Sequence, residues 1–288
     1  MKPVVLAKSV EESVYGGKAA QLAAAIRAGL PVPGGLALPA GFVDAVAADQ
    51  PYAIRKLKEI CVSLSGPVAI RSSAVGEDSE TASFAGQHLT CLNVRPSQPA
   101  LAYAVRAIWQ SARSESALAY RQRLGLPSEP RIGVVLQELV VADCAGVLFT
   151  QNPFDGADEI VIEACWGLGE SVVAGLVTPD RFRVSREGTV LERTPGMKDI
   201  AIRILPEGGT QESEVPAELI RALCLDDTRL RELHALATKC EKTFGGTQDL
   251  EWAFAGGTLY LLQRRTVTRG PADKDVPRLW PSASGGQG

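Results

Sequence analysis

Two short apolar runs separated by a long polar segment restrict the fold more than any other part of the sequence. The runs, Val68 to Ile70 and Leu89 to Val94, have the length of strands. The segment between them consists mainly of small and polar residues. The sequence therefore predicts two β-strands joined by a long polar loop, so the fold must contain a sheet.

The polar loop has features of a phosphate-binding segment. Arg71 directly follows the first apolar run, so its guanidinium can project into the loop. Ser83, Ala85 and Gly86 place little side chain on the loop backbone. Such a backbone can bring its N–H groups close to a phosphate, and an adjacent Arg can neutralise and orient that phosphate. A long hairpin with a surface Arg explains the same residues equally well.

The composition indicates a globular protein with a sizeable core. The chain has 288 residues, enough for one large domain or two ordinary ones, and 45% of them are apolar. Its 30 basic and 33 acidic side chains give a net charge of −3. This charge provides no reason to expect a nucleic acid or an anionic membrane as partner. An anionic ligand would need a local cluster of basic groups.

Cysteine usage and the apolar runs favour a cytoplasmic protein. The six cysteines are scattered and include no Cys-x-x-Cys pair, so we expect reduced, mostly buried thiols. The apolar run before Lys8 is too short for the core of a signal peptide. No apolar run approaches the length of a membrane span.

Lys18 is the first candidate ligand-binding residue. It follows Gly16 and Gly17 and begins a stretch with helical spacing that ends near Gly29. A Lys in the first turn of a helix opposes the helix dipole, unless an anion is bound between them. A solvated Lys is the simpler alternative. The segment is not a Walker A loop, because Ala19 stands where that motif has Ser or Thr.

The remaining segments predict a mixed helical and β structure. Gln137 and Glu138 are polar residues within an otherwise apolar strand, which indicates either an edge strand or a strand beside a cleft. Helices are expected over 19–28, 40–49, 51–64, 98–124 and 216–243, and strands over 35–39, 132–141, 145–150, 159–164, 182–184 and 189–192.

The segment from Thr247 to Arg265 predicts a hairpin that carries a candidate metal site. In alternating strands, Asp249 and Glu251 share one face of the first strand, and Leu261, Gln263 and Arg265 share one face of the second. Carboxylate and amide oxygens at this density suit Mg²⁺. A solvated sheet face with mixed charges is the alternative.

The metal site sets a requirement on the hairpin register. A three-residue loop pairs Phe254 with Thr258, which places Gln263 opposite Asp249 and diagonal to Glu251. Such a loop commonly ends in a left-handed residue, so we expect Gly256 or Gly257 at positive φ. A two-residue loop without a bulge would turn Gln263 to the opposite face.

Five motifs, taken together and in order, resemble one family. The chain is similar over about residues 10–270 to the N-terminal ATP-grasp, nucleotide-binding domain of pyruvate phosphate dikinase, phosphoenolpyruvate synthase and the rifampin phosphotransferases. The motifs are Gly16-Gly17-Lys18, Arg71-Ser72-Ser73 with Ala82 to Gln87, Ala145 to Thr150, Trp166 to Glu170, and Asp249 to Trp252 with Gln263-Arg264-Arg265.

The resemblance implies an α+β ATP-grasp fold, with two lobes clamping ATP in a central cleft. It assigns residues 1–270 to this domain, with the hinge between the lobes near 137–140, and leaves 271–288 as a tail or linker stub. Its implied cofactors are ATP and Mg²⁺. By this resemblance, Lys18 and Arg71 contact the phosphates, and Ser83, Ala85 and Gly86 cap them. Gln137, Glu138 and Val140 line the adenine pocket, mostly through backbone groups. Glu251 and Gln263 bind Mg²⁺, and Arg265 contacts the phosphoryl group being transferred.

Two departures from the family pattern affect the implied function. The last motif usually reads Gln-Ala-Arg-Pro, and here Arg264 and Thr266 replace Ala and Pro. Family members pass the phosphoryl group to a histidine in a Thr/Ser-Ser-His-type motif, and neither His88 nor His234 lies in such a context. The resemblance therefore implies a phosphotransferase component that acts on a histidine of a separate domain or subunit, similar to phosphoenolpyruvate synthase or phenylphosphate synthase.

Two other functions remain open from the sequence. One is a self-sufficient ATP-grasp kinase or ligase that acts directly on a small molecule. The other is a nucleotide-binding regulatory module without turnover. The sequence does not identify the final phosphoryl acceptor.

Overall fold

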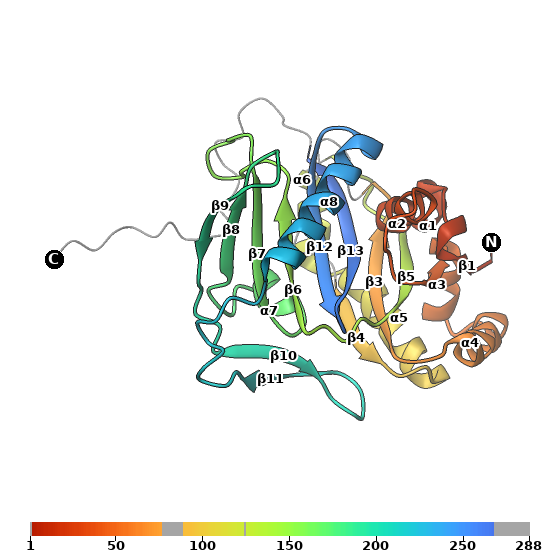
Figure 1. Ribbon diagram of the computed structural model, residues 1–288. Helices are drawn as coiled ribbons and strands as arrows, with labels where there is room; N and C mark the ends of the chain where they lie inside the picture. Colours follow the sequence, from red (N-terminus) through yellow and green to blue (C-terminus); the bar gives the residue numbers. More distant parts are fainter. Residues whose placement is uncertain (1, 77–88, 124, 268–288) are drawn as a thin grey trace.

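The computed structural model describes residues 2–76, 89–123 and 125–267, and it contains two large sheets with helices packed around them (Figure 1). The first sheet has five strands in the order β1-β2-β5-β3-β4, and the second has six in the order β13-β12-β6-β7-β8-β9. All neighbouring strands within each sheet pair antiparallel. The predicted α+β ATP-grasp architecture, with two lobes about a central pocket, is confirmed.

Helices cover both faces of the first sheet. Helices α3, α4 and α5 pack on one face through a large apolar cluster, and α1 and α2 pack on part of the other face through a smaller one. The elements of this lobe are β1 (Val4–Val5), η1 (Leu6–Lys8), α1 (Glu12–Tyr15), α2 (Gly17–Arg27), β2 (Gly35–Leu38), α3 (Ala40–Ala47), α4 (Pro51–Ser63), β3 (Val68–Ala74), β4 (Thr90–Val94), α5 (Gln98–Ser111), α6 (Glu115–Arg123) and β5 (Ile132–Glu138).

The start of helix α2 is docked against strand β3. Gly16 precedes the helix with φ +85°, and a Cβ at this position would lie 1.9 Å from the carbonyl oxygen of Ser73. Only glycine permits this approach without a shift of the backbone. The Ser73 hydroxyl then accepts a hydrogen bond of 3.0 Å from the backbone N–H of Ala19. The predicted helix behind two glycines therefore holds Lys18 beside β3.

The second sheet has its main apolar core beneath helix α8. Trp252, Phe254 and Phe182 are fully buried there and pack with Leu233 of the helix. The elements of this lobe are β6 (Cys144–Phe149), β7 (Ile160–Trp166), α7 (Glu170–Val173), β8 (Asp180–Val184), β9 (Val190–Thr194), β10 (Ile200–Ile204), β11 (Thr210–Glu214), α8 (Asp227–Phe244), β12 (Thr247–Ala255) and β13 (Thr258–Val267).

Strand β5 is the last strand of the first lobe before the chain enters the second. It lies inside its sheet, between β2 and β3, so Gln137 is not on an edge strand. The cleft interpretation of its polar residues is the one that fits, because Gln137 and Glu138 line a pocket. The chain then reaches β6 of the second sheet through residues 139–143.

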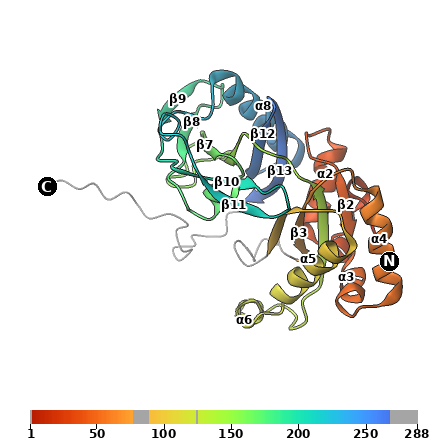
Figure 2. The same cartoon turned by 90° about the horizontal axis from the view of Figure 1, so that it is seen from below.

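A small hairpin, β10–β11, lies beside the second sheet and reaches toward β4 of the first (Figures 1 and 2). Its turn is held by Asn93 of β4, whose Nδ2 donates to the carbonyl oxygens of Leu205 and Gly209, each at 2.7 Å. The Gly209 N–H donates back to the Asn93 carbonyl oxygen at 3.0 Å. Asn93 is buried and adopts φ +53°. Arg95, which directly follows β4, also donates to the Pro206 carbonyl oxygen, so two neighbouring residues anchor the hairpin to the first sheet.

The structure corrects the predicted helix over 216–243. Helix α8 begins at Asp227, because the Asp226 side chain caps it by accepting a hydrogen bond of 2.8 Å from the Arg229 N–H. The preceding segment from Pro216 forms turns and bends instead. Strands β10 and β11 were not predicted.

The turn of the hairpin β12–β13 has two residues, so the predicted three-residue loop is wrong. Ala255 pairs with Thr258, while Gly256 and Gly257 have φ of +54° and +79°. The predicted positive φ is thus confirmed, and two consecutive left-handed glycines suit a tight hairpin turn. A one-residue irregularity follows between the pairs Trp252–Leu261 and Glu251–Gln263.

The irregularity is a β-bulge in which Leu262 is the extra residue. It restores the register that the metal site requires, because Gln263 now lies directly opposite Glu251. Leu261, expected on the same face as Gln263, is instead buried in the core with Trp252. Both Leu262 and Gln263 line the pocket.

Asp180, at the start of β8, forms a buried ion pair with Lys198. Both side chains are fully buried, and the Lys198 ammonium donates to Oδ1 of the carboxylate. The Gly196 N–H donates to the same oxygen at 2.8 Å, and the Cys224 N–H donates to Oδ2 at 2.8 Å. One carboxylate therefore joins three segments of the second lobe.

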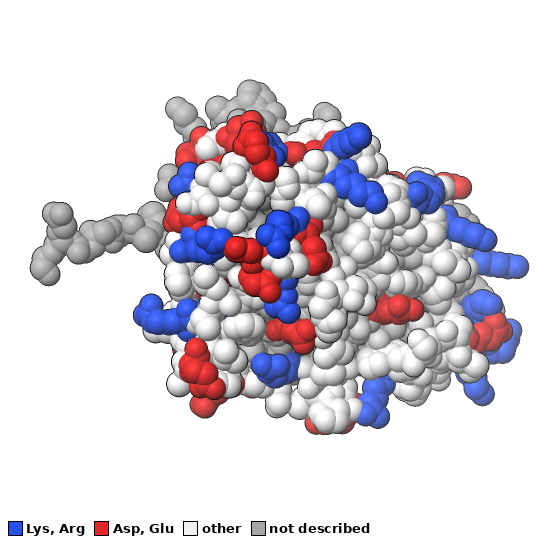
Figure 3. Space-filling model, in the orientation of Figure 1, with Lys and Arg blue, Asp and Glu red and all other residues white. Residues whose placement is uncertain are grey.

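The exposed surface carries both signs of charge. Figure 3 shows acidic and basic side chains interspersed over one face of the molecule. Of the helices in the part of the chain that the structure describes, none is both long and apolar enough to cross a membrane.

Candidate active site between the two sheets

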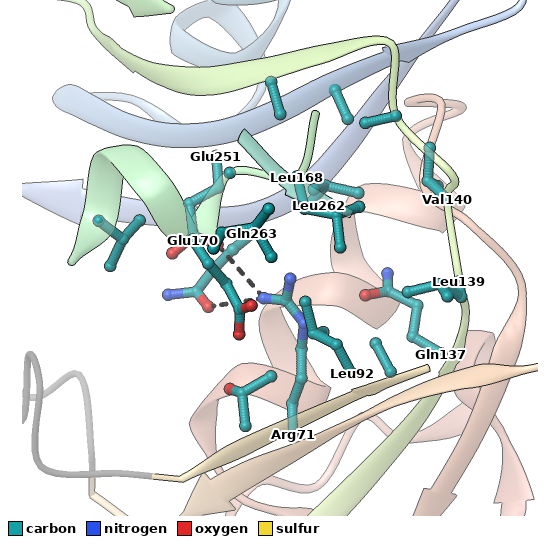
Figure 4. A pocket seen from close by; sticks show the side chains of 18 of the residues that line it. Arg71, Leu92, Gln137, Leu139, Val140, Leu168, Glu170, Glu251, Leu262 and Gln263 are labelled. Carbon is teal, nitrogen blue, oxygen red and sulfur yellow. Dashed lines mark hydrogen bonds and ion pairs between the residues drawn. The ribbon is translucent and has the colours of Figure 1, made fainter. Parts of the chain in front are cut away.

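A pocket of about 780 Å³ lies between the two sheets, with a volume typical of a small-molecule or cofactor site. Strands β3, β4 and β5 contribute side chains from the first lobe, and β6, α7, β10, β12 and β13 contribute from the second. Figure 4 shows that Arg71, Glu170, Glu251 and Gln263 gather at one end, while Leu139 and Val140 lie toward the other, together with Gln137. The pocket thus combines a polar end with an apolar end.

Arg71 is at the centre of the polar end. Its Nη1 lies 3.3 Å from a carboxylate oxygen of Glu251 and 3.3 Å from Oε1 of Gln263 (Figure 4). The Arg71 side chain is 11% exposed and that of Glu251 is 29% exposed, so this ion pair is only partly screened by water. It connects β3 of the first lobe with β12 and β13 of the second.

The structure corrects the position of Arg71 in its strand. Strand β3 continues to Ala74, so Arg71 lies within the strand instead of at its end. It pairs with Val135 on one side and Thr90 on the other. Its side chain therefore projects from the sheet into the pocket, at a position fixed by two neighbouring strands.

The Gln263 amide lies between two guanidinium groups. With its oxygen toward Arg71, it accepts the single hydrogen bond of 3.3 Å. With its oxygen turned toward Arg265, it accepts from Nε and one terminal nitrogen of that residue, each at 2.9 Å. The second orientation makes more and shorter bonds, and we favour it. In either orientation the amide NH₂ group faces a guanidinium, so two hydrogen-bond donors oppose each other. An anionic ligand that binds one of the two arginines would remove this unfavourable contact.

Lys18 reaches the pocket from the start of α2. It is buried, with 7% of its surface exposed, and its ammonium donates to the Ser72 carbonyl oxygen at 3.1 Å. This bond places the ammonium next to β3, one residue from Arg71 along the strand. Two cations from sequence positions far apart therefore line one end of the pocket, an arrangement suited to phosphate groups.

Glu251 and Gln263 fit a magnesium ion that is shared with a bound ligand. They oppose each other directly across the hairpin, and the ends of both side chains lie 3.3 Å from Nη1 of Arg71. Their oxygens can converge on one cation when the Gln263 amide has its oxygen toward Arg71. Mg²⁺ usually takes one or two protein ligands and completes its shell with phosphate oxygens and water. No group of three or more His, Cys, Asp or Glu suited to a metal occurs within the described residues.

The apolar end was not predicted from the sequence. Leu92, Leu168, Ile202 and Leu262 line it and belong to one apolar cluster that joins the two lobes. They come from β4, the loop before α7, β10 and the bulge of β13. The alternating sequence Ile200 to Ile204 was a possible signal for β10, but the bulge had no local signal.

Glu170 is a further pocket residue for which no role was predicted from the sequence. It lines the pocket at the start of α7 and lies near Arg71 in Figure 4. Burial raises the pKa of its carboxyl, and the positive charge of Arg71 opposes that shift. Glu170 therefore adds a third acceptor group to the polar end.

The structure brings most of the predicted site residues together. Those that line the pocket are Lys18, Arg71, Gln137, Glu138, Val140, Glu251, Gln263 and Arg265. Ser83, Ala85, Gly86 and His88 lie outside the described residues, as does the predicted tail, 271–288.

His234 and Cys165 lie away from the polar end of the pocket. His234 does not line the pocket, and its Nε2 bonds to the Arg186 carbonyl oxygen at 2.9 Å, as expected for a structural histidine. Cys165 is fully buried, and burial raises its pKa to about 11. Its thiol is therefore protonated near neutral pH. None of the six cysteines, all of which are described, forms a disulfide.

Proteins similar to this chain are phosphotransferases and related transferases. A probable phosphoenolpyruvate synthase from Methanothermobacter thermautotrophicus is 36% identical over 302 residues, which cover 88% of this chain and 44% of that protein. A rifampicin phosphotransferase from Streptomyces sviceus is 39% identical over 202 residues, covering 69% and 23%. The prodigiosin synthesizing transferase PigC from Serratia marcescens is 36% identical over 292 residues, covering 91% and 32%.

The chain spans less than half the length of each of these relatives. The family model described as pyruvate phosphate dikinase, AMP/ATP-binding domain, matches residues 42–281. This match and the identities confirm the resemblance drawn from the five motifs. The chain therefore belongs to the family of the pyruvate phosphate dikinase AMP/ATP-binding domain.

Proposed function

We propose that this chain is the ATP-binding component of a dikinase-type phosphotransferase. It passes a phosphoryl group from ATP-Mg²⁺ to a histidine on a separate domain or subunit. The observation that carries the proposal is the meeting of three basic side chains, Lys18, Arg71 and Arg265, with the oxygens of Glu251 and Gln263 at one end of the pocket. Phosphoryl transfer relies on positioning and on positive charge more than on covalent catalysis.

The five polar side chains have separate roles in this proposal. Lys18 and Arg71 hold the phosphate chain, whose oxygens replace Glu251 as the partner of Arg71. Glu251 and Gln263 supply two ligands to Mg²⁺, which neutralises phosphate charge when bound. Arg265 contacts the group being transferred. The adenine lies toward Gln137, Glu138 and Val140 at the other end of the pocket.

A separate histidine is proposed because the two histidines of the chain do not supply an acceptor in the described part of the pocket. His234 is bonded to a carbonyl oxygen away from the pocket. His88 lies outside the described residues, and its sequence context lacks a carrier motif. The relatives named as phosphoenolpyruvate synthase and rifampicin phosphotransferase are more than twice as long as the segments that match, which leaves room in them for such a domain.

The test is to incubate the purified chain with ATP and Mg²⁺, first alone and then with the histidine-bearing domain of a longer relative. We expect AMP only when the partner is present, together with one phosphohistidine and one phosphate per ATP, which accounts for all three phosphoryl groups. Replacing the partner histidine with Ala should abolish AMP release.

The other outcomes identify the alternative functions. Turnover that requires an added small molecule and no partner would indicate a self-sufficient kinase or ligase. Nucleotide binding without turnover under all these conditions would indicate a regulatory module. Absence of nucleotide binding would contradict all three functions.

A further inference from the structure

The Glu163 carboxylate has no bonded partner in the described part of the chain, although an arginine lies next to it. Glu163 on β7 pairs directly with Arg181 on β8. It is half-buried, yet it forms no hydrogen bond or salt bridge with any described residue. The Arg181 guanidinium instead lies over the ring of Phe154, with its central carbon 4.3 Å from the ring centre. Charged groups withdrawn from water are normally paired, so this carboxylate indicates a missing ligand.

The register of the second sheet places Glu163 on the same face as the proposed metal ligands. Its neighbours along β7, Ile162 and Ala164, belong to the core beneath α8, so Glu163 points to the opposite face. In one row of pairs, Glu251 opposes Val147, and Val147 opposes Glu163. Two strand spacings, about 10 Å, therefore separate Glu251 from Glu163. Glu163 lies beside the polar end of the pocket, just outside the residues that line it.

The surface between the two carboxylates suits an imidazole ring. Val147 presents a small apolar side chain there and is only partly buried, so this surface is not closed over. An attacking atom must come within about 3–3.5 Å of a phosphoryl group that Mg²⁺ holds at Glu251. One ring width further on, the second ring nitrogen would need an acceptor at about 2.8 Å. Glu163 stands at that distance from the metal site, on the side away from the first lobe.

We propose that Glu163 accepts a hydrogen bond from one ring nitrogen of the acceptor histidine and so turns the other nitrogen toward the phosphoryl group. The proposal rests on the proposed transfer to a separate histidine and adds the residue that orients this acceptor. The nitrogen without a proton attacks phosphorus, the bond from phosphorus to the leaving oxygen of the nucleotide breaks, and that oxygen keeps the electron pair. The other nitrogen keeps its proton, so the positive charge that develops on the ring lies beside the carboxylate.

The surroundings of Glu163 favour the approach of a cation. Burial raises the pKa of its carboxyl, and the positive charge of Arg181 opposes that shift. The loop before β7 keeps Phe154, and with it Arg181, in place, because Oδ1 of Asn152 accepts from the Phe154 N–H at 2.9 Å. Nδ2 of Asn152 donates to Glu159 at 2.7 Å. The carboxylate of Glu163 thus loses hydration without gaining a bond, and a positively charged ring would supply one.

The test measures partner-dependent AMP release by the full chain and by Glu163→Gln, with ATP, Mg²⁺ and the histidine-bearing domain of a longer relative. Gln keeps the size of the side chain and removes its charge. We expect kcat at saturating partner to fall about 10- to 100-fold, with unchanged Kd for ATP-Mg²⁺ and unchanged KM for the partner. The matched control is Glu212→Gln, the same change at an exposed position of β11 outside the pocket lining, and it should retain the wild-type kcat.

Stability distinguishes an orienting role from a structural one. A half-buried carboxylate without a bonded partner lowers stability, so Glu163→Gln should keep or raise the melting temperature while kcat falls. A structural role predicts that both fall together. If Glu163→Gln does not fold, Glu163→Asp serves as the second variant. It keeps the charge and withdraws the carboxylate by one methylene, which should also lower kcat, because orientation depends on position to about 1 Å.

The outcomes separate this inference from the proposed function. A folded Glu163→Gln variant with the wild-type kcat overturns the inference and leaves the proposed function standing. The same holds if only the KM for the partner rises or only nucleotide binding weakens, because Glu163 would then act in docking or in the nucleotide site. A wild-type protein that binds ATP and releases no AMP with the partner overturns the proposed function, and this inference with it.

Discussion

Asn93 offers the sharpest quantitative test of how the two lobes are held together. Replacing it with Ala removes both hydrogen bonds from Nδ2 to the carbonyl oxygens of Leu205 and Gly209. Each such bond contributes about 1 kcal/mol net. The φ of +53° adds a further cost of about 1 kcal/mol for Ala, which tolerates the left-handed region less well than Asn. The contact between β4 and the hairpin should therefore weaken by about 3 kcal/mol.

Native-state hydrogen exchange at the Gly209 amide measures this loss directly. That N–H donates to the Asn93 carbonyl oxygen, so it exchanges when the turn leaves β4. A loss of about 3 kcal/mol corresponds to roughly 100-fold faster exchange in Asn93→Ala. In Asn93→Gly only the side-chain bonds are lost and the backbone conformation costs nothing, so we expect about 2 kcal/mol, or roughly 30-fold.

The comparison of the two variants tests each part of the reasoning. Unchanged exchange at Gly209 in Asn93→Ala would refute the anchoring role of the side chain. Equal acceleration in the Ala and Gly variants would refute the cost assigned to the backbone conformation, while leaving the hydrogen bonds in place.

Three further predictions concern charged groups. Arg71→Ala should weaken ATP binding and partner-dependent AMP release by about 10- to 100-fold. Arg71→Lys should lose most of the same activity, because Lys lacks the planar guanidinium that binds two phosphate oxygens at once. Wild-type AMP release in Arg71→Ala would rule out the phosphate role. Glu251→Gln should raise the Mg²⁺ concentration needed for nucleotide binding without changing the melting temperature; a collapse of stability with full activity in the remaining folded protein would make Glu251 structural. Lys198→Met should lower the free energy of unfolding in urea by about 3–5 kcal/mol, because it strands the buried Asp180 carboxylate, whereas the exposed control Lys56→Met should lose less than about 1 kcal/mol.

Segments with a clear period were predictable from the sequence. The helix over 51–64 and the hairpin over 182–192 correspond to α4 and to β8–β9, because apolar spacing and turn residues act locally. Strand β11 was not predictable, because its sequence from Thr210 to Glu214 has no alternation of apolar and polar residues. Its position depends on the distant contact with Asn93 instead.

The candidate site was predictable only in part, because it also depends on contacts between residues that are distant in the sequence. Lys18, Arg71 and Glu251 could be grouped by the resemblance to a family, although no local pattern connects residues so far apart. The ion pair between Arg71 and Glu251 depends on how two sheets face each other. Two further features are visible only once the chain is folded. They are the buried Nε2 of Gln137, which has no hydrogen-bond partner among the described residues, and the buried ion pair of Asp180 with Lys198.

The bulge at Leu262 has a consequence for how this hairpin tolerates changes in length. A regular ladder beyond Trp252–Leu261 would place the next residue of β13 opposite Glu251. If Leu262 were deleted, that residue would be Gln263, so the turn, the core pairing and the Glu251–Gln263 pair could all survive. The loss would fall on the apolar wall of the pocket. A one-residue deletion at position 262 would thus alter the shape of the binding site and leave the register of the other residue pairs in this hairpin unchanged.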